Sequence, residues 1–396
     1  MKHRNELTTF TMKRTIALLA LAAFVTMANA QAGTSAQTNA SQTATPPKKV
    51  EPVLAWHNPT NWGVEGRGWT EGFARDYDRL PARAQITVPG GVWGLSRESA
   101  GLSVRFETDA PYIYVRYRLT SPNLTHGWAD CANMTCSGVD LYAQASDPAT
   151  GKQVWNWVGG NKPVTNNATD RLVNGLAPGK RQYVLNLPVY NGVESLEIGV
   201  PTNAAFAGVP PRTALPIVFY GTSIMQGGVA SRPGLAIPAF VGRRLDRPTV
   251  NLGFCGSGKM EASVVDLVAE IKAAAYVIDC APNMWAEIIA ERTEPLVRRL
   301  RQAHPDTPIL LVEHHDYPSP ESLLPRETSN IRERNAALRA AYDRLVKVGV
   351  KHLFYLPSRD LIGADGEGTG DGVHPNALGT FRYVEAYTAA LKEILQ

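Results

Sequence analysis

The pattern of hydrophobic and polar positions differs between the two halves of this sequence. Between residues 50 and 210, short alternating or β-branched and aromatic runs are separated by clusters of Asp, Asn, Gly and Pro, which is typical of strands joined by turns. The runs are Leu102–Phe106, Tyr112–Tyr117, Val139–Ala143, Gln182–Leu187 and Leu196–Val200. This pattern predicts an all-β sandwich, similar to a jelly roll.

From about residue 211 onward, apolar runs alternate with amphipathic stretches of helical period. The predicted strands are Ile217–Tyr220, Thr249–Leu252, Tyr276–Asp279, Ile309–Val312 and His352–Tyr355, and the predicted helices are Ser263–Ala274, Glu287–Gln302, Asn330–Lys347 and Asn376–Leu395. Such alternation predicts a mostly parallel sheet covered by helices on both faces. We therefore expect two domains, 50–210 and 211–396, packed together because the Pro-rich connection between them is short.

The N-terminal stretch follows neither pattern. Basic residues in Met12–Arg14 precede an apolar run, Thr15–Met27, and Ala28–Ala30 fits a small-x-small cleavage site. These features predict a signal peptide over residues 1–30, followed by a disordered polar linker over 31–49. We expect a secreted or periplasmic protein that keeps no membrane attachment after cleavage.

Composition excludes one broad class of partner. The 396 residues carry 40 Lys and Arg against 36 Asp and Glu, and the net charge of +4 includes no long basic run. A nucleic-acid footprint would need a concentrated basic surface, so no nucleic-acid partner is expected.

Four cysteines are present, and two of them lie five positions apart. In an oxidising compartment Cys131 and Cys136 are candidates for a disulfide that closes a small loop. Cys255 and Cys280 lie within the motifs described below and are expected to be small buried apolar residues.

Candidate chemistry begins at the end of the first apolar run of the second half. Ser223 follows a predicted strand after Gly221, so it is expected at the carboxyl edge of the sheet, where ligands bind in open α/β folds. A serine at this position either caps the next helix or acts as a nucleophile. The second role requires a base.

Three later stretches supply a candidate base with its orienting acid and candidate donors to an anion. Asp371 and His374, spaced i and i+3 before a final helix, can serve as the orienting acid and the base for Ser223. The Gly-rich loop around Gly256 offers backbone N–H groups to an anion, and Asn283 offers amide donors. Taken singly, the loop is also compatible with a structural turn, and Asn283 with a turn residue after proline.

Together these four stretches resemble, in order, the blocks of the SGNH (GDSL-type) hydrolase superfamily over about 180 residues. Gly221-Thr222-Ser223-Ile224 corresponds to G-D-S-L with Thr in place of Asp, and Asn283 has Pro and Met as neighbours instead of the usual G-x-N-D flanks. In the first half, Gly138–Tyr142 is similar to the G-x-D-L-Y motif of the β domain that precedes one branch of bacterial SGNH esterases.

The resemblance implies a flavodoxin-like SGNH domain and a serine esterase mechanism without metal or organic cofactor. Its oxyanion donors would be the backbone N–H groups of Ser223 and Gly256 and the side chain of Asn283. The expected substrate is an acylated carbohydrate or another small ester, and the family resemblance points toward carbohydrate deacetylation. A short acyl group, acetyl above all, is expected because the segments beside Ser223 and Gly256 are small and polar and no extended apolar insertion separates the blocks.

Two alternatives stay open: a general lipase or thioesterase, and a carbohydrate-binding protein with a weakly active hydrolase domain. The Trp-rich first half is compatible with sugar stacking and with ordinary core packing. His314 and His315 follow the fourth predicted strand, where adjacent side chains of an extended segment point to opposite faces. We therefore expect a substrate contact from one of them and no metal site.

Overall fold

The computed structural model describes residues 53–125 and 131–396, which belong to one compact unit, Pro52–Gln396. The predicted signal peptide and linker lie outside the described residues. Across the part of the chain that is described, no helix combines the length and apolar character needed to cross a membrane.

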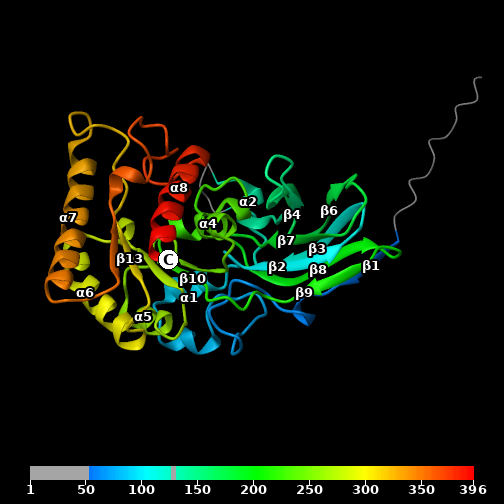
Figure 1. Ribbon diagram of the computed structural model, residues 1–396, viewed down its shortest axis with the longest axis horizontal. Coiled ribbons are helices and arrows are strands. Elements are labelled where there is room, and N and C mark those ends of the chain that lie inside the picture. Colours follow the sequence, from blue (N-terminus) through cyan, green and yellow to red (C-terminus); the bar gives the residue numbers. More distant parts are fainter. Residues whose placement is uncertain (1–52, 126–130) are drawn as a thin grey trace, which may run out of the picture. The chain divides into compact units, whose positions relative to one another are not determined.

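The first half contains two antiparallel sheets, and this confirms the predicted sandwich (Figure 1). One sheet has the strand order β1 (Leu54–His57), β8 (Val193–Pro201), β3 (Tyr112–Leu119), β6 (Asn167–Asn174). The other has the order β5 (Gln153–Gly160), β4 (Asp140–Ser146), β7 (Arg181–Asn186), β2 (Ser103–Thr108), β9 (Phe206–Val209). All five predicted strands are present, whereas β1, β5, β6 and β9, which form the edges of the sheets, were not predicted.

Alternation along the strands produces the core of this sandwich. In β3, Ile113, Val115 and Tyr117 are buried, while Arg116 and Arg118 between them are exposed. Aromatic rings from β2, β7 and β9 fill the centre, where Phe106 stacks on Tyr183 with ring centroids 5.2 Å apart. Core packing thus explains these Phe and Tyr rings, whereas the described tryptophans of this half are half-buried or, for Trp157, exposed.

The second half is a five-stranded parallel sheet, which confirms the predicted α/β class. Its order is β11 (Thr249–Gly253), β10 (Ile217–Gly221), β12 (Ala275–Asp279), β13 (Ile309–Val312), β14 (Leu353–Leu356). This is the flavodoxin-like order, in which the first strand, β10, lies between the second and the third. The sheet is covered mainly by five helices: α4 (Ile237–Leu245), α5 (Ala262–Val268), α6 (Ala286–Ala303), α7 (Pro325–Lys347) and α8 (Ala377–Ile394).

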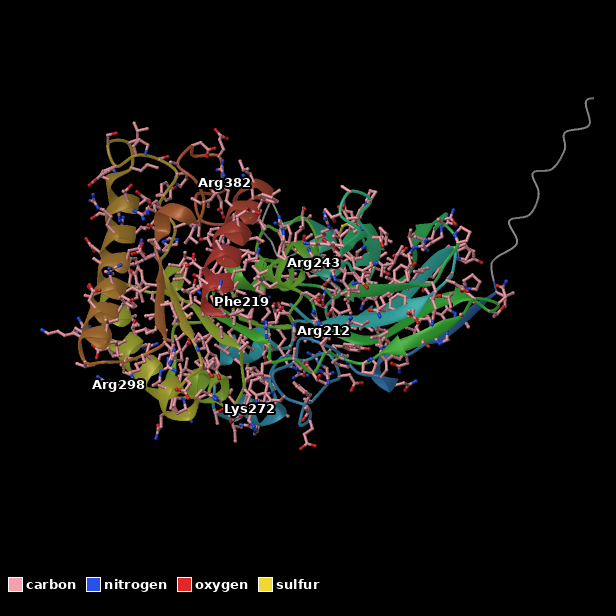
Figure 2. The ribbon with its side chains drawn as sticks, in the orientation of Figure 1. Arg212, Phe219, Arg243, Lys272, Arg298 and Arg382 are labelled. Atoms are coloured by element: carbon pink, nitrogen blue, oxygen red, sulfur yellow. A yellow bond between two sulfur atoms is a disulfide. The ribbon has the colours of Figure 1, made fainter. Side chains whose placement is uncertain are left out.

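Both faces of this sheet are apolar because both are covered. Val218 and Tyr220 of β10 face the core shared with α5, α6 and α7, whereas Ile217 and Phe219 face the core shared with α4 and α8. Figure 2 labels Phe219 at the centre of the sheet. Continuous apolar runs are thus required for these strands, and this is why the sequence pattern located them well.

Two helix boundaries differ from the sequence prediction. Helix α5 ends at Val268, six residues before the predicted Ala274, because the chain must turn before entering β12 at Ala275. Helix α7 begins at Pro325, five residues before the predicted start, with the proline in its first turn, where a missing N–H costs no hydrogen bond.

Residues 80–92 of the first half pack into the core of the second. Leu80, Ala84, Val88 and Val92 are buried together with side chains of β10 and β11. Beside them, the fully buried Arg79 guanidinium donates to the Asn251 and Gly253 carbonyls at 3.1 and 2.7 Å. Arg79 therefore satisfies acceptors of the edge strand β11, which would otherwise lack partners.

The GxDLY motif forms a second junction between the halves. The buried Asp140 accepts hydrogen bonds from the Gly234 backbone N–H at 2.9 Å and from the Asn186 side chain at 3.0 Å. Its neighbour Tyr142 accepts a hydrogen bond from Arg243 at 3.1 Å, and Figure 2 labels Arg243 at this junction. The motif thus anchors the segment that follows the Ser223 helix.

Cys131 and Cys136 are joined as a disulfide, with Cα atoms 6.8 Å apart, at the start of helix α2 (Asn133–Ser137). We predict that the mature protein contains this bond. Mass spectrometry of a non-reduced tryptic digest should find the one peptide that carries both cysteines at a mass two hydrogens below that of its reduced form. Alkylation of both thiols without prior reduction would contradict the prediction.

Candidate active site

Ser223 lies at the carboxyl edge of the parallel sheet, two residues after β10. It begins helix α3 (Ser223–Gln226), and the Thr222 side chain caps that helix by accepting the Ile224 N–H at 3.3 Å. Thr222 is thus the helix cap, and Ser223 is available for chemistry. Gly221 is required before them because a Cβ there would lie 2.6 Å from the Asp279 carbonyl oxygen.

The structure brings Ser223, His374 and Asp371 together. Ser223 Oγ lies 2.8 Å from His374 Nε2, and His374 Nδ1 lies 2.6 Å from Asp371 Oδ2. Ser223 is 6% exposed. The three side chains form one continuous hydrogen-bonded chain, which is the arrangement needed to remove a proton from the serine hydroxyl.

The local turn holds Asp371 in place. Its Oδ1 accepts the backbone N–H groups of Val373 at 2.9 Å and His374 at 2.7 Å, which leaves Oδ2 for the imidazole. Burial opposes ionisation of Asp371, but the hydrogen bonds from His374 and Val373 outweigh it and keep the pKa of this carboxyl below its ordinary value. Asp371 is therefore ionised and can orient the His374 ring.

The loop that carries Gly256 lies after β11, beside the Ser223 helix. Gly256 has φ +62°, and the space where a Cβ would stand is open. Among the described residues, no protein acceptor takes the Gly256 N–H. Gln226 fixes the loop because its Oε1 accepts the Cys255 N–H at 2.9 Å while its Nε2 donates to Glu98 at 2.5 Å.

Asn283 lies close to the same loop, but its amide contacts protein carbonyls. Asn283 Nδ2 donates to the Ser257 carbonyl, and its distance to the Phe254 carbonyl oxygen is 3.4 Å. In this state the side chain braces the Gly256 loop. An oxyanion role for Asn283 requires Nδ2 to exchange one of these carbonyls for a substrate oxygen.

Two histidines follow β13 and are buried behind this edge. His314 is 3% exposed and His315 is fully buried, and their ring centroids lie 4.8 Å apart. The two rings are thus in contact. The expectation that these side chains point to opposite faces of the extended segment is therefore wrong. His315 Nδ1 lies 2.6 Å from the Tyr383 hydroxyl. Within residues 53–125 and 131–396, no group of three potential metal ligands gathers.

Asp279, at the end of β12, is a buried carboxyl next to the site. Burial raises its pKa to about 7, although a hydrogen bond from Tyr387 at 2.5 Å opposes this change. The unfolded chain releases this proton near the ordinary pKa of 3.8. Between about pH 4 and 7 the folded state therefore holds the extra proton, and its stability falls as the pH rises.

We predict that Asp279→Asn removes this pH dependence. Relative to the wild type, the free energy of unfolding of Asp279→Asn should increase by about 2 to 3 kcal/mol between pH 5 and pH 8. Urea denaturation at the two pH values measures this difference, and any constant packing cost of the substitution cancels. If the free energies of unfolding of the two proteins changed with pH in parallel, Asp279 would not be the group with the raised pKa.

Comparisons with known proteins agree with this geometry. The GDSL-like lipase/acylhydrolase family model matches residues 214–392, and the model for the GxDLY N-terminus of SGNH-hydrolase-type esterases matches residues 54–206. A crystal structure from Bacteroides ovatus, classed as a GDSL-like lipase, is 32% identical, has a TM-score of 0.80, and is matched over 87% of this chain and 98% of its own.

The chain therefore belongs to the GDSL-like lipase/acylhydrolase family. Within it, the N-terminal match is to the GxDLY domain, so both predicted resemblances are confirmed. A comparison with curated proteins gave no match.

Two other solved structures share the fold at lower identity. The salicylyl-acyltransferase SsfX3 from a tetracycline biosynthetic pathway is 20% identical with a TM-score of 0.65, covering 86% of this chain and 98% of that one. An acetyl xylan esterase from the rumen bacterium Butyrivibrio proteoclasticus is 11% identical with a TM-score of 0.53, covering 87% and 99%. At these identities the likeness concerns the fold.

Several residues around the site were not found from the sequence. Glu98 and Arg79 come from the first half, and burial raises the pKa of Glu98 to about 7. Trp285 and Arg334, near Asn283, were also missed. Each of them contacts partners that lie far apart in the chain, and a single sequence carries no local signal for such contacts.

Proposed function

We propose that this protein is a secreted serine esterase that hydrolyses short acyl esters, with acetyl esters of carbohydrates as the favoured substrates. The observation that carries the proposal is the hydrogen-bonded chain from Ser223 through His374 to Asp371. Family membership supports ester hydrolysis, and secretion rests on the predicted signal peptide.

In the acylation step, Ser223 Oγ attacks the ester carbonyl while His374 Nε2 takes the hydroxyl proton. Asp371 Oδ2 accepts the Nδ1–H bond and stabilises the imidazolium that forms. The carbonyl oxygen becomes negative, and the N–H groups of Ser223 and Gly256 and the Asn283 amide would stabilise it. Removing one such donor typically costs about 3 kcal/mol of transition-state stabilisation.

Collapse of the tetrahedral intermediate breaks the bond to the alcohol, which leaves with the proton held by His374. Water then enters, His374 removes its proton, and attack on the acyl-serine releases the acid and regenerates Ser223. The Ser223 proton leaves on the alcohol and a proton from water, carried by His374, replaces it, so each step balances with the triad and water alone.

The groups gathered at this edge support a short and polar acyl pocket. The segments beside Ser223 and Gly256 are small and polar, with Gln226-Gly227-Gly228 after the serine and Ser257-Gly258-Lys259 after the glycine. A long acyl chain would have to be buried against apolar surface to contribute about 0.8 kcal/mol per methylene. The carbohydrate class is supported by the fold shared with an acetyl xylan esterase.

We expect activity to fall as the acyl chain lengthens. In a series of p-nitrophenyl esters from acetate to octanoate, kcat/KM should drop at least about tenfold beyond butyrate, because extra methylenes find no apolar pocket. Ser223→Ala, assayed in parallel, separates enzymatic from background hydrolysis. A rise toward octanoate would favour a lipase or thioesterase instead.

Acetate release from a panel of acetylated glycans tests the carbohydrate assignment. Release from at least one glycan, lost in Ser223→Ala, is the expected result. If p-nitrophenyl acetate is hydrolysed but no glycan is, the sugar assignment is wrong while the esterase assignment stands. Glycan binding without hydrolysis of any ester would favour a carbohydrate-binding protein.

A further inference from the structure

His314 is a buried polar side chain whose ring nitrogens have no hydrogen-bond partner in the part of the chain that the structure describes. It is 3% exposed, and no described protein group lies within hydrogen-bond distance of either ring nitrogen. Burial lowers its pKa well below the ordinary value, and the nearby His315, Arg334 and His374 lower it further. The ring is therefore neutral and presents one donor and one acceptor. Buried groups of this kind are normally satisfied, so the site needs another partner.

Arg334, on α7, is a half-buried cation with no carboxylate partner among the described side chains. Its Nε is buried and finds no acceptor among residues 53–125 and 131–396, and its Nη1 reaches the Pro282 carbonyl only at 3.5 Å. Burial alone accounts for the lowered pKa of Arg334, since no acidic group opposes the shift. A partly desolvated charge without a counter-ion is costly.

Both side chains belong to the edge that carries Ser223. The carbonyl that Arg334 reaches is that of Pro282, the residue before Asn283. The Arg334 guanidinium also lies 5.0 Å from the centre of the Trp285 ring, and this indole is 55% exposed. A cation, a neutral imidazole and an accessible aromatic ring are thus gathered between the Asn283 loop and His374.

We propose that Arg334 and His314 bind a carboxylate of the ester substrate, so that the enzyme prefers esters carrying an acidic group. This inference rests on the proposed esterase function. A guanidinium matches the fork geometry of a carboxylate, and the His314 N–H supplies a further donor to it. The exposed Trp285 face beside them suits a ring, so an acylated uronic acid has the required chemistry.

The acidic group can belong to the alcohol or to the acyl part, and two pairs of substrates distinguish these sources. For the alcohol side, 4-acetoxybenzoate is compared with neutral 4-acetoxybenzamide. For the acyl side, mono-4-nitrophenyl glutarate is compared with 4-nitrophenyl valerate, after correction for spontaneous hydrolysis. The quantity measured is the ratio of kcat/KM for the acidic ester to that for its neutral partner.

The wild type should show a ratio of about ten or more in at least one pair, as expected for one charge-assisted hydrogen-bonded contact. Arg334→Gln should bring that ratio to about one, and Arg334→Lys should retain part of it. His314→Phe, which removes the ring N–H, should also lower it. Arg298→Gln, on the outer part of α6 and labelled in Figure 2, is the matched control and should leave the ratio unchanged.

A wild-type ratio near or below one in both pairs would overturn the proposal, as would a high ratio that survives in Arg334→Gln. Either result, together with Ser223-dependent hydrolysis of 4-nitrophenyl acetate, would leave the esterase assignment intact. If none of the esters is hydrolysed, the proposed function itself fails.

Discussion

Ser223→Ala should reduce kcat for 4-nitrophenyl acetate by about 10⁴-fold or more. The substitution removes the hydroxyl oxygen that lies 2.8 Å from His374 Nε2, so no covalent acyl intermediate can form at this position. The Gly256 loop and Asn283 remain, and they can supply only the small residual acceleration that oxyanion stabilisation gives alone.

The fold of Ser223→Ala should be preserved, because a small polar side chain is lost from the edge of the sheet and no core cavity is created. The thermal midpoint should stay within a few degrees of the wild type, as for other substitutions outside the core. Ser231→Ala, at an exposed serine eight residues further on, controls for the general effect of losing a hydroxyl. Wild-type hydrolysis by Ser223→Ala would mean that another residue is the nucleophile.

Asp371→Asn should reduce kcat by about 10³- to 10⁴-fold, with KM less affected. An Asn carbonyl at the Oδ1 position can still accept the Val373 and His374 backbone N–H groups, so the turn should persist. The amide NH₂ would then face His374 Nδ1 and make that nitrogen an acceptor. The ring proton would move to Nε2, where it prevents His374 from acting as the base for Ser223.

A comparison with Asp371→Ala separates two effects of Asp371 on His374. One is the orientation of the imidazole ring, and the other is the choice of the nitrogen that carries the proton. Asp371→Ala removes the contact without imposing the wrong tautomer, so it should retain more activity than His374→Ala. Proton NMR of Asp371→Asn should place the ring proton on Nε2 in the variant and on Nδ1 in the wild type. Equal activities of Asp371→Asn and the wild type would show that His374 needs no acidic partner.

The sequence predicted the covered sheet of the second half and the central strands of the sandwich. Strands such as Ile217–Gly221 are buried on both faces, so their hydrophobicity is continuous and easily recognised. The missed strands β1, β5, β6 and β9 all lie at sheet edges. Edge strands bury less side-chain surface; β6, for example, contains Asn, Thr, Asp and Arg, so its pattern is that of a polar loop.

The candidate triad was also found from the sequence, because Ser223 follows the end of a strand and Asp371 and His374 form a short motif before the final helix. The groups that position them were not found. Arg79 and Glu98 belong to the first half, yet they contact β11 and Gln226 of the second. Such long-range contacts are set by tertiary packing, and the residues involved carry no local motif.

The GxDLY motif was recognised in the sequence, but its structural role was not predicted from it. Its residue types match a known motif, whereas the contacts that explain them appear only in the structure. Asp140 is buried against Gly234, between the sandwich and the segment after the Ser223 helix. The motif acts through a contact 94 residues along the chain, which sequence spacing does not reveal.

The central claim is that Ser223 forms the covalent acyl intermediate, and labelling the intact protein with diisopropyl fluorophosphate tests it most directly. An activated serine should react once per chain, and loss of 4-nitrophenyl acetate hydrolysis should follow the extent of labelling. Peptide mass spectrometry is predicted to place the adduct on Ser223, with no adduct in Ser223→Ala. Full inactivation with the adduct on another residue, or an unlabelled Ser223 in inactivated protein, would contradict the account.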